Sequence, residues 1–436
     1  MPQELTAGGN ALAVREFDSP VQEASIWSSL RNCWLVIPLL YFSTNGAFLT
    51  NGEFVSTTGF AGPSDADSLL SRAQQGGIWG IAVLLMYPYY RTILRAFHAN
   101  KALSTLITFT MISVIWSPGV LDSIRRATLL ALTARFAYFL AEKFKPQELM
   151  RLIYFTGCLA AVGSLITIAI SPRYGFMSTG EWKGIFGHKN DLGIYLCFML
   201  SPILFLPAKA TMRNVAGIIC ALVGVVLIIG SQSRGAWIVA AALFAYVAVL
   251  KVIHRMATTR DAIAFSATLA GIITVIGLLI YENYAAITYF MGKDPSLTNR
   301  GLIWNAVLGC IAERPILGYG YGGFWRGIHG ESIKVISAVG VNISHAHNGY
   351  LNLTLQTGLV GLGLFVFVLL VSCRNAFVTI YSRRIKSGEW YGAILLMTVV
   401  ASSDESFLMN YNAITTILFM IACVGLHNIV AGEEAG

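Results

Sequence analysis

Long apolar runs fill most of this chain and decide what it can fold into. About twelve runs of roughly 15 to 20 residues follow one another, each near the length of a helix that crosses the hydrocarbon of a bilayer. Backbone groups in hydrocarbon must bond within their own segment, so such spans are helical. The sequence therefore predicts an all-α polytopic membrane protein with about twelve transmembrane helices. The predicted spans are residues 33–50, 76–90, 102–116, 127–142, 152–171, 191–207, 214–231, 236–253, 262–281, 351–372, 390–409 and 411–430.

The composition excludes a large soluble enzyme. The chain has 436 residues, of which 56% are hydrophobic and 12% are charged, whereas soluble proteins carry about 25% charged residues. Its mean hydropathy is +0.65. The net charge of +8 does not indicate nucleic-acid binding, because the chain has no basic stripe with interleaved aromatic residues. The seven cysteines lack metal-type spacing and lie mostly in or beside apolar runs, which argues against a disulfide framework.

Lysine and arginine set the predicted orientation. They occur in alternate connections, which the positive-inside rule assigns to the cytoplasm. Both termini then lie in the cytoplasm, and residues 282–350 form a long periplasmic loop. Residues 1–32 are polar and lack the short basic start of a signal peptide, so we expect a cytoplasmic tail before a retained first anchor. Residues 33–436 are expected to form the transmembrane domain, including the long loop.

The long loop carries folding signals of its own. Ile303, Trp304, Val307, Leu308 and Ile311 recur at helical spacing and form one apolar stripe. A proline at position 315 ends this helix, and the glycines and aromatics of residues 318–325 predict a turn region that shapes a cap. A structureless loop of about 70 residues would be unusual, so the loop is expected to be partly helical.

Four polar patches fall at the predicted outer face, at residues 186–190, 231–235, 297–301 and 345–361. Together they supply histidines, which can take a proton near neutral pH. They also supply arginines and helix N-termini, which suit a diphosphate. Basic residues on this side run against the topology rule and are therefore candidates for binding an anion. They are Arg125, Arg126, Arg173, Lys183, Lys189, Arg234, Arg300, Arg314 and Arg326.

The order of these patches resembles the O-antigen ligase and exopolysaccharide polymerase family, from about residue 110 to the end of the tenth predicted span. The most specific element is His347-Asn348, nine residues, Gly358, two residues and Gly361. The resemblance implies a metal-independent, inverting membrane glycosyltransferase. Its donor would be a glycan on undecaprenyl diphosphate, at the periplasmic face of the bacterial inner membrane. Carried over, His347 is the catalytic residue, and Arg234 and Arg300 bind the diphosphate.

Further substrate-binding candidates are His188, Lys189, Asn348 and His345. Each also has a structural explanation, since His188 and Lys189 could cap a helix and His345 could support the neighbouring histidine. One departure is Asn299, where the family often has glycine, but asparagine also tolerates the left-handed conformation.

Three ionisable residues, Arg135, Asp404 and Glu405, fall inside predicted spans, where a charge is costly and usually faces a cavity or a partner. A structural ion pair and a role at the substrate are both open for them. No Asp-x-Asp pair stands near the four patches, so no metal or other cofactor is expected.

Two acceptors separate two functions within this family. A polymerase adds the glycan to another lipid-linked repeat unit, whereas a ligase adds it to a lipid A core sugar. The combination of FGHKN with HAHNGYL favours the polymerase. A lipid-linked sugar flippase is a rival of another class, but the inverted repeats and midplane site that it predicts are not evident. Expected partners are the lipid-linked donor, the acceptor glycan or lipid A core, the bilayer and polysaccharide assembly proteins, with no nucleic acid.

Reporter fusions test the predicted topology. Fusions after residues 98, 256 and 380 should report the cytoplasm, because basic connections stay on that side. A fusion after residue 335 should report the periplasm. A cytoplasmic signal at residue 335 would contradict the predicted side of all four patches.

Overall fold

The computed structural model describes residues 34–44, 69–207, 215–256, 258–266, 268, 300–382 and 386–434. The predicted N-terminal tail, most of the predicted ninth span and residues 282–299 of the long loop lie outside the described residues.

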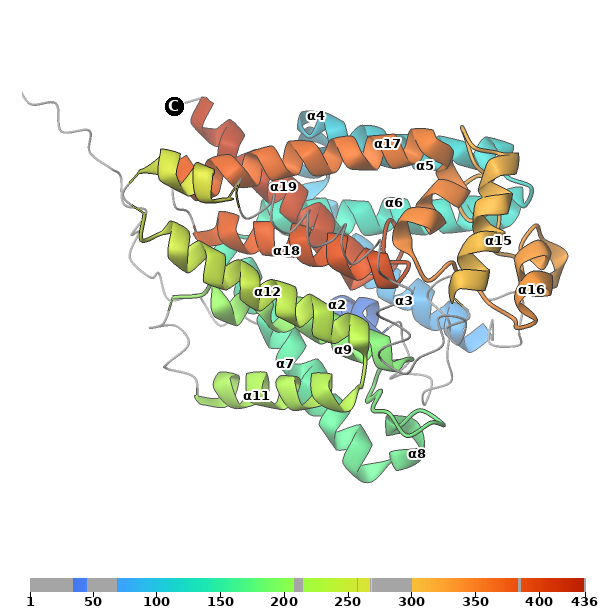
Figure 1. Cartoon of the computed structure of the whole chain (residues 1–436), viewed down its shortest axis with the longest axis horizontal. Coiled ribbons are helices and arrows are strands. Elements are labelled where there is room, and N and C mark those ends of the chain that lie inside the picture. The colour runs from blue at the N-terminus through green and yellow to red at the C-terminus, as the bar shows by residue number, and fades with distance from the viewer. Residues whose placement is uncertain are drawn as a thin grey trace, which may run out of the picture.

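The described chain is helical, and its only strand-like pairing is an isolated bridge between Phe176 and Trp182. The all-α class is therefore confirmed (Figure 1). The helices are α2 (Val36–Thr44), α3 (Leu69–Met86), α4 (Tyr90–Ala99), α5 (Lys101–Ile112), α6 (Val120–Lys143), α7 (Pro146–Ile170), α8 (Pro172–Gly175), α9 (Lys189–Leu200), α11 (Val215–Gly230), α12 (Arg234–Ile253), α15 (Arg300–Glu313), α16 (Ile333–Val339), α17 (Gly349–Phe377), α18 (Lys386–Asp404) and α19 (Ile414–Glu434).

Four of the described helices are long and apolar enough to cross a membrane, and a bent pair could supply a fifth span. The four lie at Pro146–Ile170, Arg234–Ile253, Gly349–Tyr381 and Ile414–Gly432. The bent pair turns by 99° between Ala99 and Lys101. Asn100 lies at this turn, where its side chain accepts a hydrogen bond from the backbone of Leu103 and so caps α5. These helices indicate a membrane protein, but the count of about twelve spans stays a prediction.

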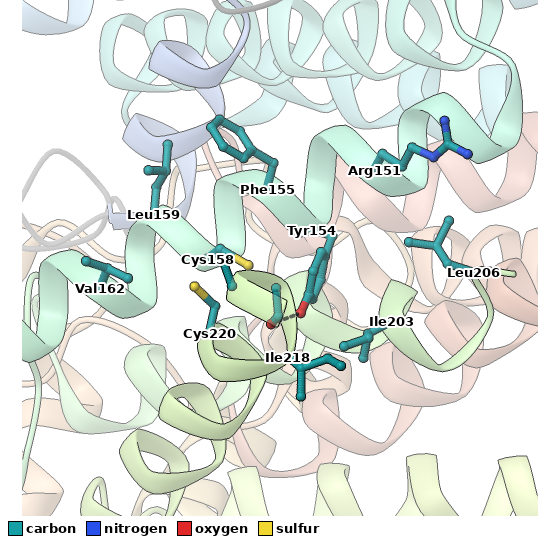
Figure 2. Close-up of a pocket in the computed structure, with 12 residues that line it drawn as sticks. Arg151, Tyr154, Phe155, Cys158, Leu159, Val162, Ile203, Leu206, Ile218 and Cys220 are labelled. Carbon is teal, nitrogen blue, oxygen red and sulfur yellow. Dashed lines mark hydrogen bonds between the residues drawn. The ribbon is translucent and has the colours of Figure 1, made fainter. Parts of the chain in front are cut away.

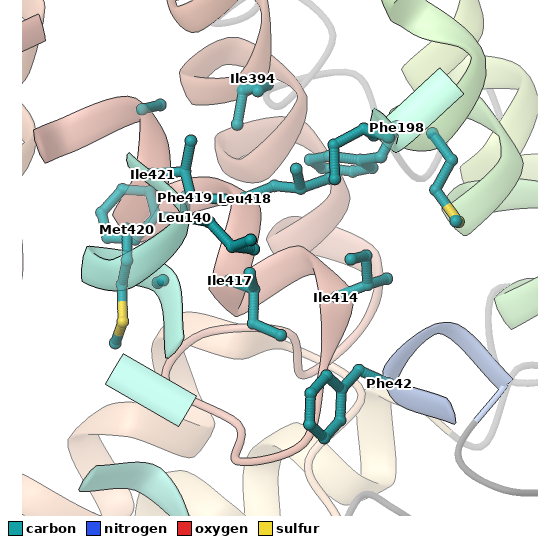
Figure 3. Close-up of a cluster of buried hydrophobic side chains, with 14 of the residues drawn as sticks. Phe42, Leu140, Phe198, Ile394, Ile414, Ile417, Leu418, Phe419, Met420 and Ile421 are labelled. Carbon is teal, nitrogen blue, oxygen red and sulfur yellow. The ribbon is translucent and has the colours of Figure 1, made fainter. Parts of the chain in front are cut away.

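Helix α19 forms the centre of the bundle. Within the most apolar stretch of α19, 72% of the residues are buried inside the protein, compared with 28% in the corresponding stretch of α12. Figure 3 shows side chains of α19, including Ile417 and Leu418, packing with Phe42 of α2, Leu140 of α6 and Ile394 of α18. Large apolar side chains of α11 and α12 are instead exposed. Such an apolar exterior is stable against lipid and costly in water.

The long loop forms a cap at one end of the bundle, built on α15 and α16 (Figure 1). The cap has its own apolar core, which includes Ile303, Val307 and Trp325. The predicted stripe is therefore confirmed in part, although Leu308 is exposed. All four aromatics of residues 318–325 are buried. This burial confirms that the glycine-aromatic segment shapes the cap.

Gly358 breaks α17 and docks the cap onto it. Its φ of 67° and ψ of −172° are non-helical, so the backbone groups beyond it need other partners. The carbonyl of Pro315 accepts a hydrogen bond from Leu359 N at 2.8 Å, and the carbonyl of Ile316 accepts one from Val360 N at 3.2 Å. A Cβ at position 358 would lie 2.0 Å from the Ile316 carbonyl oxygen. The first glycine of the sequence motif is therefore needed for this close approach.

Replacing Gly358 with alanine should destabilise the protein. This combination of positive φ with extended ψ is essentially restricted to glycine and costs another residue about 1–3 kcal/mol. The Cβ would also collide with Ile316. Gly363→Ala is the matched control in the same helix, because a Cβ there meets nothing within 4 Å. We expect Gly358→Ala to lower the melting temperature and Gly363→Ala not to lower it. Thermal unfolding in detergent measures both. Equal melting temperatures for the two variants would contradict the docking role.

Candidate active site

The turn before α17 carries two histidines side by side. His347 has a left-handed backbone with φ of 47°, and its N–H donates to Nδ1 of His345 at 3.2 Å. The two rings lie 3.9 Å apart between centroids. Asn348 follows as the N-cap of α17, and its side-chain oxygen accepts hydrogen bonds from the backbone of Tyr350 and Leu351. The structure thus gives Asn348, a predicted substrate ligand, a capping role.

Glu405 joins three distant parts of the chain at this turn. It directly follows α18, and its side chain is only 9% exposed. Its Oε2 lies 3.2 Å from Nδ1 of His347, and its Oε1 accepts a hydrogen bond from the Asn190 amide at 2.6 Å. These contacts place the Glu405 carboxylate between the start of α9 and the histidine turn.

Arg300 is the first residue of α15 and pairs with two carboxylates. Its guanidinium bonds to Asp404, the last residue of α18, and lies 3.4 Å from Glu405 Oε1. Both acidic residues therefore form ion pairs with a predicted site residue. Each partner is mostly buried, so solvent screens the pairs less than it would on a surface.

Arg234 is the first residue of α12, and Ser233 caps that helix. Its side chain is exposed and forms no ion pair with any residue that the structure describes. The following residue, Gly235, lies against Asp404, because a Cβ there would stand 2.2 Å from Asp404 Oδ2. The glycine of the Ser-Arg-Gly patch thus lets the start of α12 approach the carboxylate that holds Arg300. Both helices that begin with a predicted diphosphate ligand, α12 and α15, therefore start beside Asp404.

His188 and Lys189 begin α9 beside this cluster. His188 is the N-cap, and its Nδ1 accepts a hydrogen bond from Asn190 N at 3.2 Å. Lys189 forms an ion pair with Glu181 at 2.7 Å. Burial lowers the pKa of His188, and the nearby His347 adds to this effect. Capping and ion pairing thus account for the main contacts of both residues, and their role at the substrate stays a prediction.

Burial also lowers the pKa of His345 to about 3, with support from the neighbouring histidines and Arg300. His345 is therefore neutral at physiological pH. Together with His347 and Glu405 it forms a set of possible metal ligands, whose ligand atoms all lie within 4.8 Å of one another. The sequence did not suggest this set, because Glu405 lies 58 residues from His347.

Several of the outer basic residues hold the cap. Arg126 donates to the carbonyls of Gly322 and Trp325. Arg326 pairs with Asp122 at 3.3 Å, and the Arg314 guanidinium lies over a cap tyrosine. These contacts give Arg126, Arg314 and Arg326 structural roles in the cap, and the anion-binding role of the outer basic residues stays a prediction.

A separate cavity of about 430 Å³ lies between α7, α11 and the segment after α9. Figure 2 shows its apolar lining, with Phe155, Leu159 and Ile218, and with Arg151 at one side. None of the predicted site residues lines it.

Comparison with known proteins gives the cluster a context. Residues 218–366 match the sequence profile of a family described as O-Antigen ligase. The chain is 22% identical over 356 residues to "Exopolysaccharide production protein ExoQ" of Rhizobium meliloti (strain 1021), which covers 79% of this chain and 81% of that protein. It is 33% identical over 86 residues to "Putative polysaccharide ligase" of Rickettsia felis, which covers 18% of this chain and 20% of that protein.

A double-mutant cycle tests the ion pair. Arg300→Gln should lower the melting temperature more than Asp404→Asn, because it leaves the carboxylates of Asp404 and Glu405 without their countercharge. The double variant should lose less than the sum of the single variants, with a coupling of about 0.5–3 kcal/mol. Thermal unfolding followed by tryptophan fluorescence gives the three values. Strictly additive losses would show that the two side chains do not interact.

Proposed function

We propose, from the premise that this chain belongs to the O-antigen ligase and exopolysaccharide polymerase superfamily, that it transfers glycan chains between lipid-linked and acceptor sugars. The donor is a glycan on undecaprenyl diphosphate, and the acceptor is a sugar hydroxyl. The reaction takes place at the periplasmic face of the inner membrane. The contact between His347 and the buried Glu405 carboxylate carries this proposal, because it provides an oriented base.

His347 acts as the general base. Its Nδ1–H donates to Glu405, which leaves Nε2 with the lone pair. Nε2 accepts the proton of the acceptor hydroxyl as the oxygen attacks the anomeric carbon of the donor. The charge on Glu405 stabilises the imidazolium that forms. The side chain of His347 is 28% exposed, so a substrate can reach it.

The two arginines stabilise the departing diphosphate. Arg234 is exposed at the start of α12 and offers a planar fork to phosphate oxygens. Arg300 lies at the start of α15 and shares its charge between the acidic pair and the donor. Backbone N–H groups at both helix starts add further donors. A diphosphate is a good leaving group, so the reaction needs no metal, and a single displacement inverts the anomeric centre.

The identity of the acceptor distinguishes a polymerase from a ligase. Similarity to ExoQ over most of both chains supports polymerisation of exopolysaccharide repeat units, which is our first proposal. The O-Antigen ligase profile and the shorter similarity to a polysaccharide ligase support transfer to a lipid A core as the second.

Substitution of His347 tests the base. His347→Ala should fold and bind the donor but lose about a hundred- to ten-thousand-fold in transfer, the usual contribution of a general base. Glu405→Gln should also reduce turnover, because it removes the charge that orients and stabilises the ring. Transfer of purified lipid-linked glycan gives the rates, and a donor-binding assay confirms folding.

His98→Gln is the control, since His98 is exposed on α4, outside the cluster. It should transfer at the wild-type rate. If His347→Ala lowered the transfer rate only about two- or threefold, His347 would not be the general base, because a general base contributes far more.

The products that accumulate after gene deletion separate the two functions. Loss of a polymerase should leave single repeat units on the lipid carrier, because no chain is built. Loss of a ligase should leave long chains on the carrier, since polymerisation continues. Mass spectrometry of extracted lipid-linked glycans makes the distinction.

A further inference from the structure

The spacing of His347 and Glu405 matches two ligands of one metal ion. Zinc binds histidine nitrogen and carboxylate oxygen at about 2.0–2.2 Å. Two ligands of a tetrahedral ion at these lengths stand about 3.3 Å apart. Nδ1 of His347 and Oε2 of Glu405 are 3.2 Å apart. His345 supplies a third ligand atom within 4.8 Å of both. The pair thus has the separation that a tetrahedral ion requires, with a further imidazole beside it.

We propose that His345, His347 and Glu405 form a binding site for a divalent transition-metal ion of the zinc type, and that the bound ion switches glycan transfer off. Two imidazoles and one carboxylate suit zinc, cobalt or nickel better than magnesium or calcium, which prefer oxygen ligands. Three protein ligands leave a fourth position for water. The partial exposure of His347 gives the ion access.

Surrounding contacts already orient the ligands. The Asn190 amide donates to Oε1 of Glu405, which leaves Oε2 toward the histidines. Residues that hydrogen-bond to metal ligands without binding the ion themselves raise metal affinity about 10–100-fold. The positive charge of Arg300 lies nearby, but Asp404 neutralises much of it. Binding through Nδ1 of His345 would replace one hydrogen bond, which the backbone N–H of His347 donates.

The inhibition rests on the proposed function, whereas the binding does not. A neutral imidazole has one proton and one lone pair. When the ion takes Nδ1 of His347, the ring proton moves from Nδ1 to Nε2. Nε2 then has no lone pair for the acceptor hydroxyl. The metal also replaces the hydrogen bond between His347 and Glu405. His347 then lacks both the lone pair on Nε2 and the orienting contact with the carboxylate.

Cobalt absorption tests the binding directly. The full chain is purified in detergent, its affinity tag is removed, and Co²⁺ is titrated while visible absorption is recorded, with Zn²⁺ as the competitor. We expect one ion per chain. His345→Gln and Glu405→Gln should each weaken cobalt binding at least about tenfold, because loss of a residue that only orients a ligand already costs that much affinity. His98→Gln should bind as the wild type does, because that exposed histidine lies outside the set.

Transfer assays with added Zn²⁺ test the inhibition. Zinc should abolish transfer by the wild type, and a chelator should restore it. Each variant is compared with its own zinc-free rate, and His345→Gln should need at least about tenfold more zinc. Absent binding, or equal binding by wild type and His345→Gln, would overturn the site. Binding at the three residues without inhibition would leave the site standing and contradict His347 as the base. A requirement for zinc would support the site, but it would overturn both the proposed inhibition and metal-independent transfer.

Discussion

A buried carboxylate organises this end of the protein. Taking Glu405 out of water is costly unless its charge is paired and its oxygens accept hydrogen bonds. Those partners come from three places in the chain: Asn190 on α9, Arg300 on α15 and His347 before α17. Each partner lies at or near the start of a helix, so satisfying one side chain fixes how three helices begin. The geometry of the proposed base therefore depends on the packing of the whole bundle end.

The same principle joins the cap to the bundle. The break at Gly358 leaves backbone groups of α17 without helical partners, and the segment after α15 supplies them. Further contacts repeat this pattern. The Trp325 indole donates to the Asn352 side chain, and the Gly322 backbone donates to Gln356. The Trp304 indole donates to the Ala346 carbonyl, directly between the two histidines. The cap thus holds the histidine turn from one side while Glu405 holds it from the other.

Local patterns predicted part of this arrangement. Apolar runs were enough for the all-α class, and the polar patches pointed to His347 and Arg300, which the structure brings to the same acidic residue. Glu405 was singled out as an ionisable residue inside a predicted span, but its partners were not identified. An acidic residue at the end of an apolar run says nothing about a partner 58 residues away. Asn348 caps α17 in the structure, and its contact with substrate stays a prediction. Asparagine is both a common polar ligand and a favoured helix cap, and the sequence does not separate the two.

The break in α17 also has a consequence for how such proteins can be recombined. The stretch of α17 before Gly358 is hydrogen-bonded to the cap. The first residues beyond the glycine donate backbone hydrogen bonds to carbonyls of the same loop. Residues 300–360 therefore form one interlocked unit, although α17 begins only at Gly349. A chimera that exchanged only the loop up to the histidines would separate the cap from the part of α17 to which it is hydrogen-bonded. A chimera joined beyond Val360, where α17 continues as a regular helix, would keep this unit whole.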